Sequence, residues 1–499
     1  MVFTGYLIPL LTLSTQALAS YTGNLNYRHA RLGIDLEKVT ARSLSKRDEA
    51  PYTPSQLNFT HGVASGDPYA DSVILWTRVA PRMQSDESDV TVSGDVPLYN
   101  HETERFVEAK GLDPFTTYYY QFNALNEYFN VYGNVVRKDN VDYVVHLGDY
   151  IYEYGFDAAE YRTDFDLAAS HQHFARIPVW DDHEIANNGY RDGSSGLNNT
   201  EYSFLNVGPQ VSVDQRKMNA VRAYFEWMPI RQVDMDDGLR IWRSFQMGNL
   251  MDLIMLDTRN YNRSITSLEW NDDYIERIQN DTGRSLMGAR QENWLYRQLS
   301  DSVNRGTTWR VIGSQLRFPR LEQEVDGEVI VNLDSWDGYR ANYNRTPKHM
   351  YDNNIGNNIM LAGYTHTNWV SDLAWIGEKS YDSAIGEGAV GVEFAGTAVS
   401  SEGFGGTISS AEAEAGTYKK NEEMRWTEGY YRGYYELHVK QDEVFRAGEN
   451  HLARPVAGGE VEAGYFRDGQ VKHSNLTLNT ETGKWETIGL GKMFLKVEA

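Results

Sequence analysis

Five short apolar runs in this chain each end at a cluster of polar or charged residues. Short apolar runs bounded by turn signals are typical of buried strands, and open α/β sheets carry their chemistry beyond the carboxyl ends of such strands. The runs are VDYVVHL at 141–147, IPVW at 177–180, LIML at 253–256, WRVI at 309–312 and NIMLA at 358–362. The pattern therefore predicts an α/β enzyme with its site at the edge of a sheet.

The residues that follow these runs are the ligand types of a metal site. Asp149 follows the first run, Asp182 and His183 follow the second, and His366 follows the fifth. Oxygen and imidazole donors suit divalent or ferric ions, and the phenol of Tyr152 stands one helical turn after Asp149. Any single cluster could instead be a set of turn residues. Five such strand ends in one chain favour a metal site.

Six sequence segments carry a family resemblance. They are VVHLGDYIYEYG, IPVWDDHEIANN, LDTRNYNR, LDSWDGYRANYNRTPKHMYDNNIGNNIMLAG, THTNWVSDL and EFAGTAVSS. In this order, between about Phe59 and Ser401, they resemble the PhoD-like alkaline phosphatase/phosphodiesterase family within the calcineurin-like metallophosphoesterases. The resemblance implies a metal-dependent phosphoric ester hydrolase. It also implies an α/β fold, a four-layer sandwich of two central β-sheets flanked by helices.

The resemblance assigns the first two clusters to Ca²⁺ and Fe³⁺. Asp149 would bridge two ions, because a carboxylate has two oxygens, and Tyr152 would complete the ferric side. Asp182 would bind the calcium-like ion, which readily takes oxygen ligands. His183 would donate a proton to the leaving alkoxide or hydrogen-bond the phosphate. A core tyrosine, a turn aspartate and a core histidine are the alternative interpretations of Tyr152, Asp182 and His183.

The remaining site residues come from later strand ends. Arg259 is predicted to be catalytic and to bind substrate, because a guanidinium can meet two phosphate oxygens at once. It could equally form an ion pair with Asp257 or Asp337. Asp337 is a second predicted substrate-binding residue, and His366 is predicted to be a metal ligand or its outer-shell partner.

Two positions depart from the family pattern. The family carries a cysteine-bearing strand before the first cluster, and its thiolate helps to bind ferric iron, whereas this chain has no cysteine. Where the family usually has Asp, in a Gly-Asp-x-His pattern, this chain has Tyr364. A second hypothesis therefore stays open: a catalytically impaired homologue, or an incomplete gene sequence, that retains only the fold and phosphate binding.

The length of 499 residues predicts more than one domain. Residues 1–19 have the short apolar core and small-residue cleavage site of a secretory signal, which predicts a secreted, extracellular protein with no membrane span after signal removal. A connecting or propeptide segment at 20–57 follows. Residues 58–123 are predicted to form a small, shortened fibronectin III-like β domain, on the resemblance of GLDPFTTYYY at 111–120 to a Tyr-corner segment. Residues 124–499 would form the catalytic domain.

Two crossover helices are expected between the strands. One begins at a cap residue, Asp214, and ends before Pro229, with an apolar face listed as Met218, Val221, Tyr224, Phe225 and Met228. The second runs from about 289 to 303, with its apolar face listed as Trp294, Leu295, Leu299 and Val303. The Glu-, Ala- and Gly-rich stretch at 402–416 is interpreted as a loop.

The net charge of -23 argues against a nucleic-acid-binding surface, because such surfaces need stripes of Lys and Arg. Small phosphate esters remain possible substrates, since bound metal ions can invert the local field. We expect a monomer. Glycosylation is predicted at five Asn-x-Ser/Thr sequons: Asn58, Asn198, Asn262, Asn280 and Asn475. A sixth, at Asn344, is set aside because Pro347 follows it.

Overall fold

A computed structural model of the protein describes most of the chain after residue 140. The described ranges are 57–69, 72–81, 103–110, 141–151, 173–195, 212–437 with a few single gaps, 461–467, 470–479 and 484–489, with isolated residues between them. The predicted leader, the segment 20–56, the aromatic segment 111–120, Tyr152 and Asn198 lie outside the described residues. Among these ranges, no helix has the length and apolar character needed to cross a bilayer.

The largest sheet has seven strands in the order β14-β12-β13-β11-β8-β7-β6. The strands β7, β8, β11 and β13 run parallel to their neighbours, so their carboxyl ends lie at one edge. Three predicted runs are therefore confirmed as neighbouring parallel strands. The bounds are β6 Arg243–Met247, β7 Met251–Met255, β8 Trp309–Gly313, β11 Asn358–Ala362, β12 Asn368–Asp372, β13 Gly391–Ala395 and β14 Met424–Glu428.

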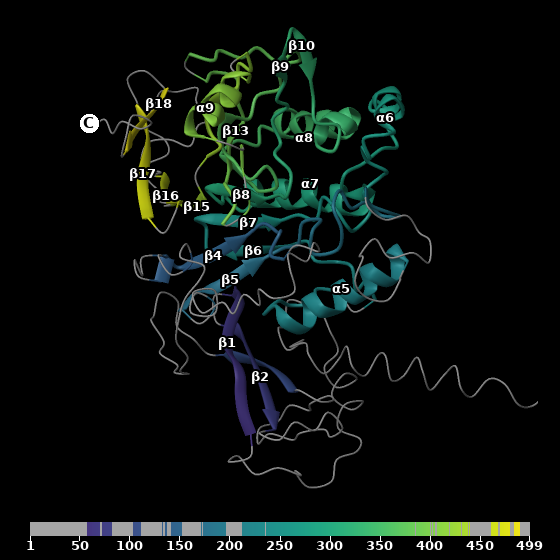
Figure 1. The fold of residues 1–499 in the computed structure, drawn as a ribbon, viewed down its shortest axis with the longest axis vertical. Coiled ribbons are helices and arrows are strands. Elements are labelled where there is room, and N and C mark those ends of the chain that lie inside the picture. The colour runs from purple at the N-terminus through teal and green to yellow at the C-terminus, as the bar shows by residue number, and fades with distance from the viewer. Residues whose placement is uncertain are drawn as a thin grey trace, which may run out of the picture.

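The other two predicted runs lie in a second, five-stranded sheet of order β3-β2-β1-β5-β4. The strands β4 and β5 are parallel, and β1 joins them through a parallel pairing of Gly66 with Arg176. The other edge of β1 continues into an antiparallel meander with β2 and β3, which projects from the body in Figure 1. The bounds are β1 Leu57–Tyr69, β2 Ser72–Pro81, β3 Thr103–Lys110, β4 Tyr143–His146 and β5 Ala175–Pro178.

Alternation along β7 shows how the layers pack. Leu253 and Met255 belong to the same buried cluster as Ile177 of β5, whereas Ile254 and Leu256 belong to the cluster under the helices. Side chains on a strand alternate between faces, so each face of the large sheet has its own core. Figure 1 shows helices α8 and α7, strands β8 and β7, strands β4 and β5, and helix α5 following one another down the view. The described residues thus form a mixed α/β fold of several sheets.

The first expected helix is confirmed as α5, Val213–Trp227. Its cap is Ser212, whose side chain accepts from the Gln215 N–H, so the prediction of Asp214 as the cap was wrong by two residues. Met218, predicted to lie on the apolar face, is 67% exposed and is not part of the core.

The second expected helix is α7, Gly288–Asn304. Leu295 and Leu299 are buried against the large sheet as predicted, whereas Val303 is exposed because it lies at the end of the helix. The stretch predicted as a loop contains α9, Ile408–Gly416, which begins with a reciprocal capping box between Thr407 and Ser410.

The remaining elements complete the described fold. The hairpin of β9 and β10 precedes η3 and α8, and a four-stranded antiparallel sheet of order β15-β16-β17-β18 follows the large sheet. The bounds are α6 Asp272–Ile278, β9 Gln323–Val325, β10 Glu328–Ile330, η3 Trp336–Tyr339, α8 Arg340–Asp352, β15 Arg432–Leu437, β16 Val461–Arg467, β17 Gln470–Asn479 and β18 Lys484–Gly489.

Candidate metal centre

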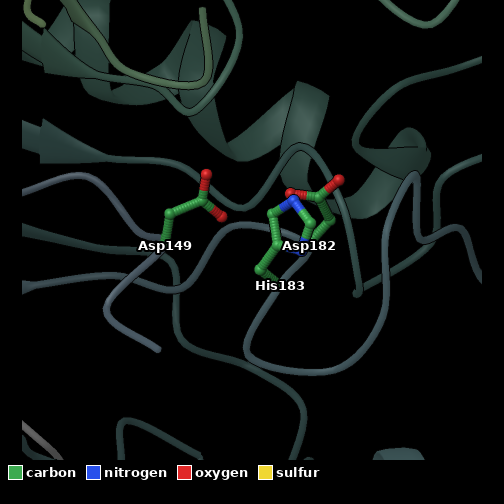
Figure 2. A group of neighbouring side chains, drawn as sticks. All are labelled: Asp149, Asp182 and His183. Atoms are coloured by element: carbon green, nitrogen blue, oxygen red, sulfur yellow. The ribbon is translucent and has the colours of Figure 1, made fainter. Parts of the chain in front are cut away.

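Three of the predicted site residues meet beyond the ends of β4 and β5. One ligand atom from each of Asp149, Asp182 and His183 lies within 4.8 Å of the other two. Figure 2 shows Asp182 and His183 side by side, with Asp149 facing them from a separate loop. His366, beyond β11 of the other sheet, reaches the same place, with its Nε2 atom 3.6 Å from Oδ2 of Asp149. The structure therefore brings four residues together, although the first of them, Asp149, and the last, His366, stand more than two hundred positions apart in the sequence.

The backbone at these strand ends is held in unusual conformations. Asp149 has a φ of 55°, Tyr364 of 65° and His366 of 56°, all in the left-handed region that non-glycine residues rarely occupy. Each such residue costs on the order of 1 kcal/mol, and strain of this kind persists where the surrounding structure fixes it. Gly148 has a φ of 107°, and a Cβ atom there would lie 2.2 Å from the backbone nitrogen of Asp181. Only glycine fits at that approach of the two loops.

Asp182 has the environment of a metal ligand. Its side chain is fully buried, and Oδ2 accepts a hydrogen bond from the Asn188 N–H at 2.7 Å. The other oxygen, Oδ1, is buried and has no hydrogen-bond partner in the described part of the chain. A buried carboxylate oxygen without a partner is costly unless a cation or a donor satisfies it. The residues present therefore fit a bound cation.

The carboxyl groups of this cluster differ in their electrostatics. Burial raises the pKa of Asp182 above its usual range, although the charge of Arg259 opposes the rise. Burial acts in the same direction on Asp149, but the hydrogen bond and charge of His366, together with the charge of His183, bring the pKa of Asp149 below its usual range. A cation at the cluster would favour the ionised form of both.

Glu184 fastens the two ligand loops together. Its Oε1 atom accepts from the Tyr150 N–H at 2.6 Å, and its Oε2 atom accepts from the Asp181 N–H at 2.8 Å. Tyr150 follows Asp149 and Asp181 precedes Asp182, so one buried carboxylate spans both loops. Burial and the nearby charge of Asp149 raise the pKa of Glu184 to about 8. Sequence analysis did not assign this residue, although it stands in the same motif.

Arg259 is fully buried and lies next to Asp182 of the cluster. Its Nε atom donates to Oδ1 of Asp181 at 2.5 Å, and its Nη1 atom donates to Oδ2 of Asp334 at 2.5 Å. Its Nη2 atom lies 3.6 Å from Oδ2 of Asp182, and the ring of Tyr364 covers the guanidinium at 4.2 Å. Three carboxylates and an aromatic ring thus surround this arginine, and one of the carboxylates, Asp182, belongs to the cluster.

The ion-pair partners considered for Arg259 from the sequence were wrong. Asp257 accepts hydrogen bonds from the backbone N–H of Arg259 and from the Trp180 indole, rather than from the guanidinium. Asp337 pairs with Arg320 at 2.5 Å and lies 3.9 Å from Arg340. The guanidinium instead pairs with Asp181 and with Asp334, which stands three residues before Asp337. A role for Asp337 in substrate binding stays a prediction.

Comparison with known proteins places this geometry in a family. Residues 118–161 and 157–447 match the family described as PhoD-like phosphatase, and residues 44–104 match its N-terminal domain. The chain belongs to the PhoD-like phosphatase family. It is 30% identical over 487 residues to alkaline phosphatase D of Bacillus subtilis (strain 168), covering 81% of this chain and 79% of that protein. These matches support a phosphatase enzyme that acts on small molecules.

A solved structure described as "Structure of PhoD" has the same fold. Its TM-score is 0.62 at 24% sequence identity, and the match covers 90% of this chain and 94% of that chain. As a PhoD-like phosphatase, this chain carries its candidate metal centre within the segment that matches the family. Tyr152 and the position of the family cysteine lie outside the described residues.

The sequons whose side chains are described differ in their surroundings. Asn280 is exposed in the turn after α6, and Thr282, which completes its sequon, is exposed as well. The amide oxygen of Asn262 accepts from Arg191 at 3.3 Å, and that of Asn344 accepts from the Trp375 indole at 3.0 Å. Asn58 and Asn475 lie on β1 and β17. Glycosylation at the predicted sites remains a prediction.

Proposed function

We propose that this PhoD-like phosphatase is a metal-dependent hydrolase of phosphate mono- or diesters. The observation that carries the proposal is the meeting of Asp149, Asp182 and His183 within 4.8 Å, with a buried oxygen of Asp182 that no described donor satisfies. Metal ions held there would neutralise charge on the phosphoryl oxygens and acidify an attacking water. Oxygen ligands of this kind suit calcium. Iron is proposed through Tyr152 and on the family resemblance alone.

Each residue of the cluster has a separate proposed task. The carboxylate of Asp182 would be a ligand in a fixed position, because the N–H of Asn188 holds one of its oxygens. Asp149 is 11% exposed and His366 is 25% exposed, so the substrate would enter on their side. His366 orients the Asp149 carboxylate from β11, and His183 would hold the phosphate or protonate the leaving oxygen. Because these residues directly follow strands, the sheets would hold their side chains in fixed relative positions.

We propose that Arg259 acts mainly by holding three buried carboxylates in place, those of Asp181, Asp182 and Asp334. Its guanidinium donates to Asp181 and Asp334 and lies next to Asp182, so it neutralises carboxylates that would otherwise repel one another. The Nη2 atom has no hydrogen-bond partner in the described part of the chain, so the contact with phosphate predicted from the sequence would be made through Nη2 while the bonds to Asp181 and Asp334 remain. Tyr364 packs over the guanidinium face in the place of the family aspartate.

The finer fold and location are also proposals. We propose that the complete molecule is the four-layer sandwich predicted from the sequence, with a small β domain at its N-terminus. We propose further that the leader at 1–19 directs secretion. The N-terminal sequence of protein recovered from the medium of expressing cells checks this, because an uncleaved leader would contradict export.

Removal of metal tests the proposed function. Hydrolysis of para-nitrophenyl phosphate and of bis(para-nitrophenyl) phosphate should cease after chelation and return when calcium is added. Asp182→Asn should lower calcium affinity by more than about 100-fold, since loss of an outer-shell partner alone costs about 10–100-fold. The matched control is Asp192→Asn, an exposed carboxylate ten positions along the same loop region that forms an ion pair with the neighbouring Arg191.

The outcomes separate this proposal from the alternative. Hydrolysis that is insensitive to chelation, or equal calcium affinity in Asp182→Asn, would contradict the metal mechanism. Calcium binding without hydrolysis of either ester would favour the impaired homologue. The observation that favours this alternative is the Tyr364 ring, which covers the Arg259 guanidinium where the family usually has Asp.

A further inference from the structure

Lys217 is a buried lysine on the face of α5 that packs against the body of the protein. Its side chain is only 7% exposed, in a helix whose other charged residues, such as Arg222, lie largely at the surface. Its Nζ atom donates to the backbone carbonyls of Tyr190 at 3.1 Å, Arg191 at 3.0 Å and Asn260 at 3.3 Å. The ammonium group has three N–H donors, and these three carbonyls match that number.

The carbonyls belong to two loops that shape the metal centre. Tyr190 and Arg191 lie in the loop whose Asn188 N–H holds Oδ2 of Asp182. Asn260 follows Arg259, and its side-chain amide donates to the Asp181 carbonyl at 2.9 Å. One ammonium group therefore connects helix α5 to the loop after β5 and to the loop after β7.

The amino group of Lys217 makes hydrogen bonds that packing alone does not supply. Burial lowers its pKa, and the more distant charges of Asp257, Asp192 and Asp214 oppose that effect. Burying an ammonium group is expensive, and an apolar side chain would fill the same space without that cost. What an apolar side chain could not do is hold three carbonyls from two separate loops. The neighbouring Arg216 adds a similar bond, from its Nε atom to the Ile185 carbonyl at 2.8 Å.

We propose that Lys217 is a positioning residue that sets the geometry of the candidate metal centre through its hydrogen bonds to two loops. It holds the loop that fixes Asp182 and the loop that carries Arg259 at a constant separation. The effect on metal binding rests on the proposed function, whereas the effect on the two loops does not.

The test compares Lys217→Met with Lys217→Arg and with a matched control on the same helix, Arg222→Met. Methionine is unbranched and only one atom shorter than lysine, and it removes all three donors, whereas arginine keeps a charge and several donors. Hydrogen exchange of the peptides covering 182–193 and 257–263 is measured in the metal-free protein. Calcium affinity is then measured by calorimetry for each variant, at a temperature at which each is folded.

We expect faster exchange in both loops of Lys217→Met and a calcium affinity lower by about 10–100-fold, the usual effect of losing an outer-shell support. Lys217→Arg should lie between that variant and the wild type, and Arg222→Met should match the wild type.

Wild-type exchange in both loops, or a wild-type calcium affinity with only a lower melting temperature, would overturn the proposal and leave Lys217 as a helix anchor. If Lys217→Met does not fold, the same measurements on Lys217→Arg decide. If the wild type itself takes up no calcium, the proposed function fails, and the exchange rates alone decide whether Lys217 holds the loops.

Discussion

Asp149 and Asp182 meet at one cluster but stand in different surroundings. Asp149 is partly exposed and faces His366, whereas Asp182 is fully buried and is held by a backbone N–H. An entering ligand could reach the first carboxylate from solvent, whereas the second cannot move without breaking its hydrogen bond. On the proposed function, Asp182 would hold the cation and Asp149 would face the substrate.

Glu184→Gln should weaken calcium binding without unfolding the protein. Glutamine has the same shape, but its amide nitrogen cannot accept, so either the Tyr150 or the Asp181 N–H loses its partner. The two ligand loops would then separate, and we expect a calcium affinity lower by about 10–100-fold. Calorimetric titration with calcium measures the change.

The matched control for this prediction is Glu226→Gln on α5. Glu226 pairs with Arg222 across one turn of the helix, so its loss should leave calcium affinity unchanged. Equal calcium affinity in Glu184→Gln and the wild type would show that the loops are held by other contacts.

At the scale of residues, the motifs predicted side chains that meet at the candidate metal centre but not the residues that support them. Asp149, Asp182 and His183 could be predicted because each directly follows an apolar run. The pairing of Arg259 with Asp334 rather than Asp337 could not, because three residues of one turn decide which carboxylate faces the arginine. Supports of this kind depend on how loops cross in space, and spacing along the chain does not record that.

At the scale of elements, strand positions were predictable and element ends were not. The run 358–362 coincides with β11, because a short apolar run bounded by turn signals is typical of a buried strand. The loop predicted at 402–416 contains α9, since Thr407 and Ser410 cap each other and four alanine and isoleucine residues favour the helix that follows. The loop was predicted from the Glu-, Ala- and Gly-rich composition of the segment, and composition does not record a capping pair.

Asp67→Asn should destabilise the attachment of β1 to the body of the protein. Asp67 is fully buried, accepts from Arg243 at 2.6 Å and from the Arg231 N–H at 2.6 Å, and has a φ of 45°. Asparagine tolerates that backbone, so the substitution removes charge without adding strain. Leaving the arginine unpaired should cost about 3–5 kcal/mol and lower the melting temperature.

Thermal unfolding of metal-free protein measures this effect. Asp192→Asn, which breaks an exposed pair with Arg191, serves as the control and should leave the melting temperature unchanged. A melting temperature equal to that of the wild type in Asp67→Asn would mean that β1 is held by its strand pairing alone.

At the scale of the whole molecule, the candidate metal centre contains residues that follow strands of two different sheets. Asp149 and Asp182 come from the sheet that contains β1, and His366 comes from the large sheet. The sequence predicted the strands but not that β1 would join β5 in parallel, because a single residue pair makes that connection. Long-range pairings of this kind leave no periodic signal in the chain.

The contribution of Glu393 to the stability of the whole molecule should fall as the pH rises from 5 to 8. This residue lies on β13 in the large sheet, is fully buried, and accepts from the Phe318 N–H at 2.6 Å. Burial raises its pKa to about 8, although the Phe318 N–H and the charge of Arg317 oppose the rise. In the unfolded chain the pKa of glutamate is about 4.3.

A pKa that is higher in the folded state stabilises the fold fully below about pH 4.3, and that stabilisation is lost as the pH rises toward 8. Glu393→Gln cannot ionise, so it should lose less stability over this range, by on the order of 1–4 kcal/mol. Urea unfolding in the presence of chelator, at several pH values, measures the difference. Glu423, whose pKa burial raises to about 7, should leave a smaller decline in the same direction. Parallel pH profiles for the variant and the wild type would show that Glu393 is already ionised in the folded protein at pH 5.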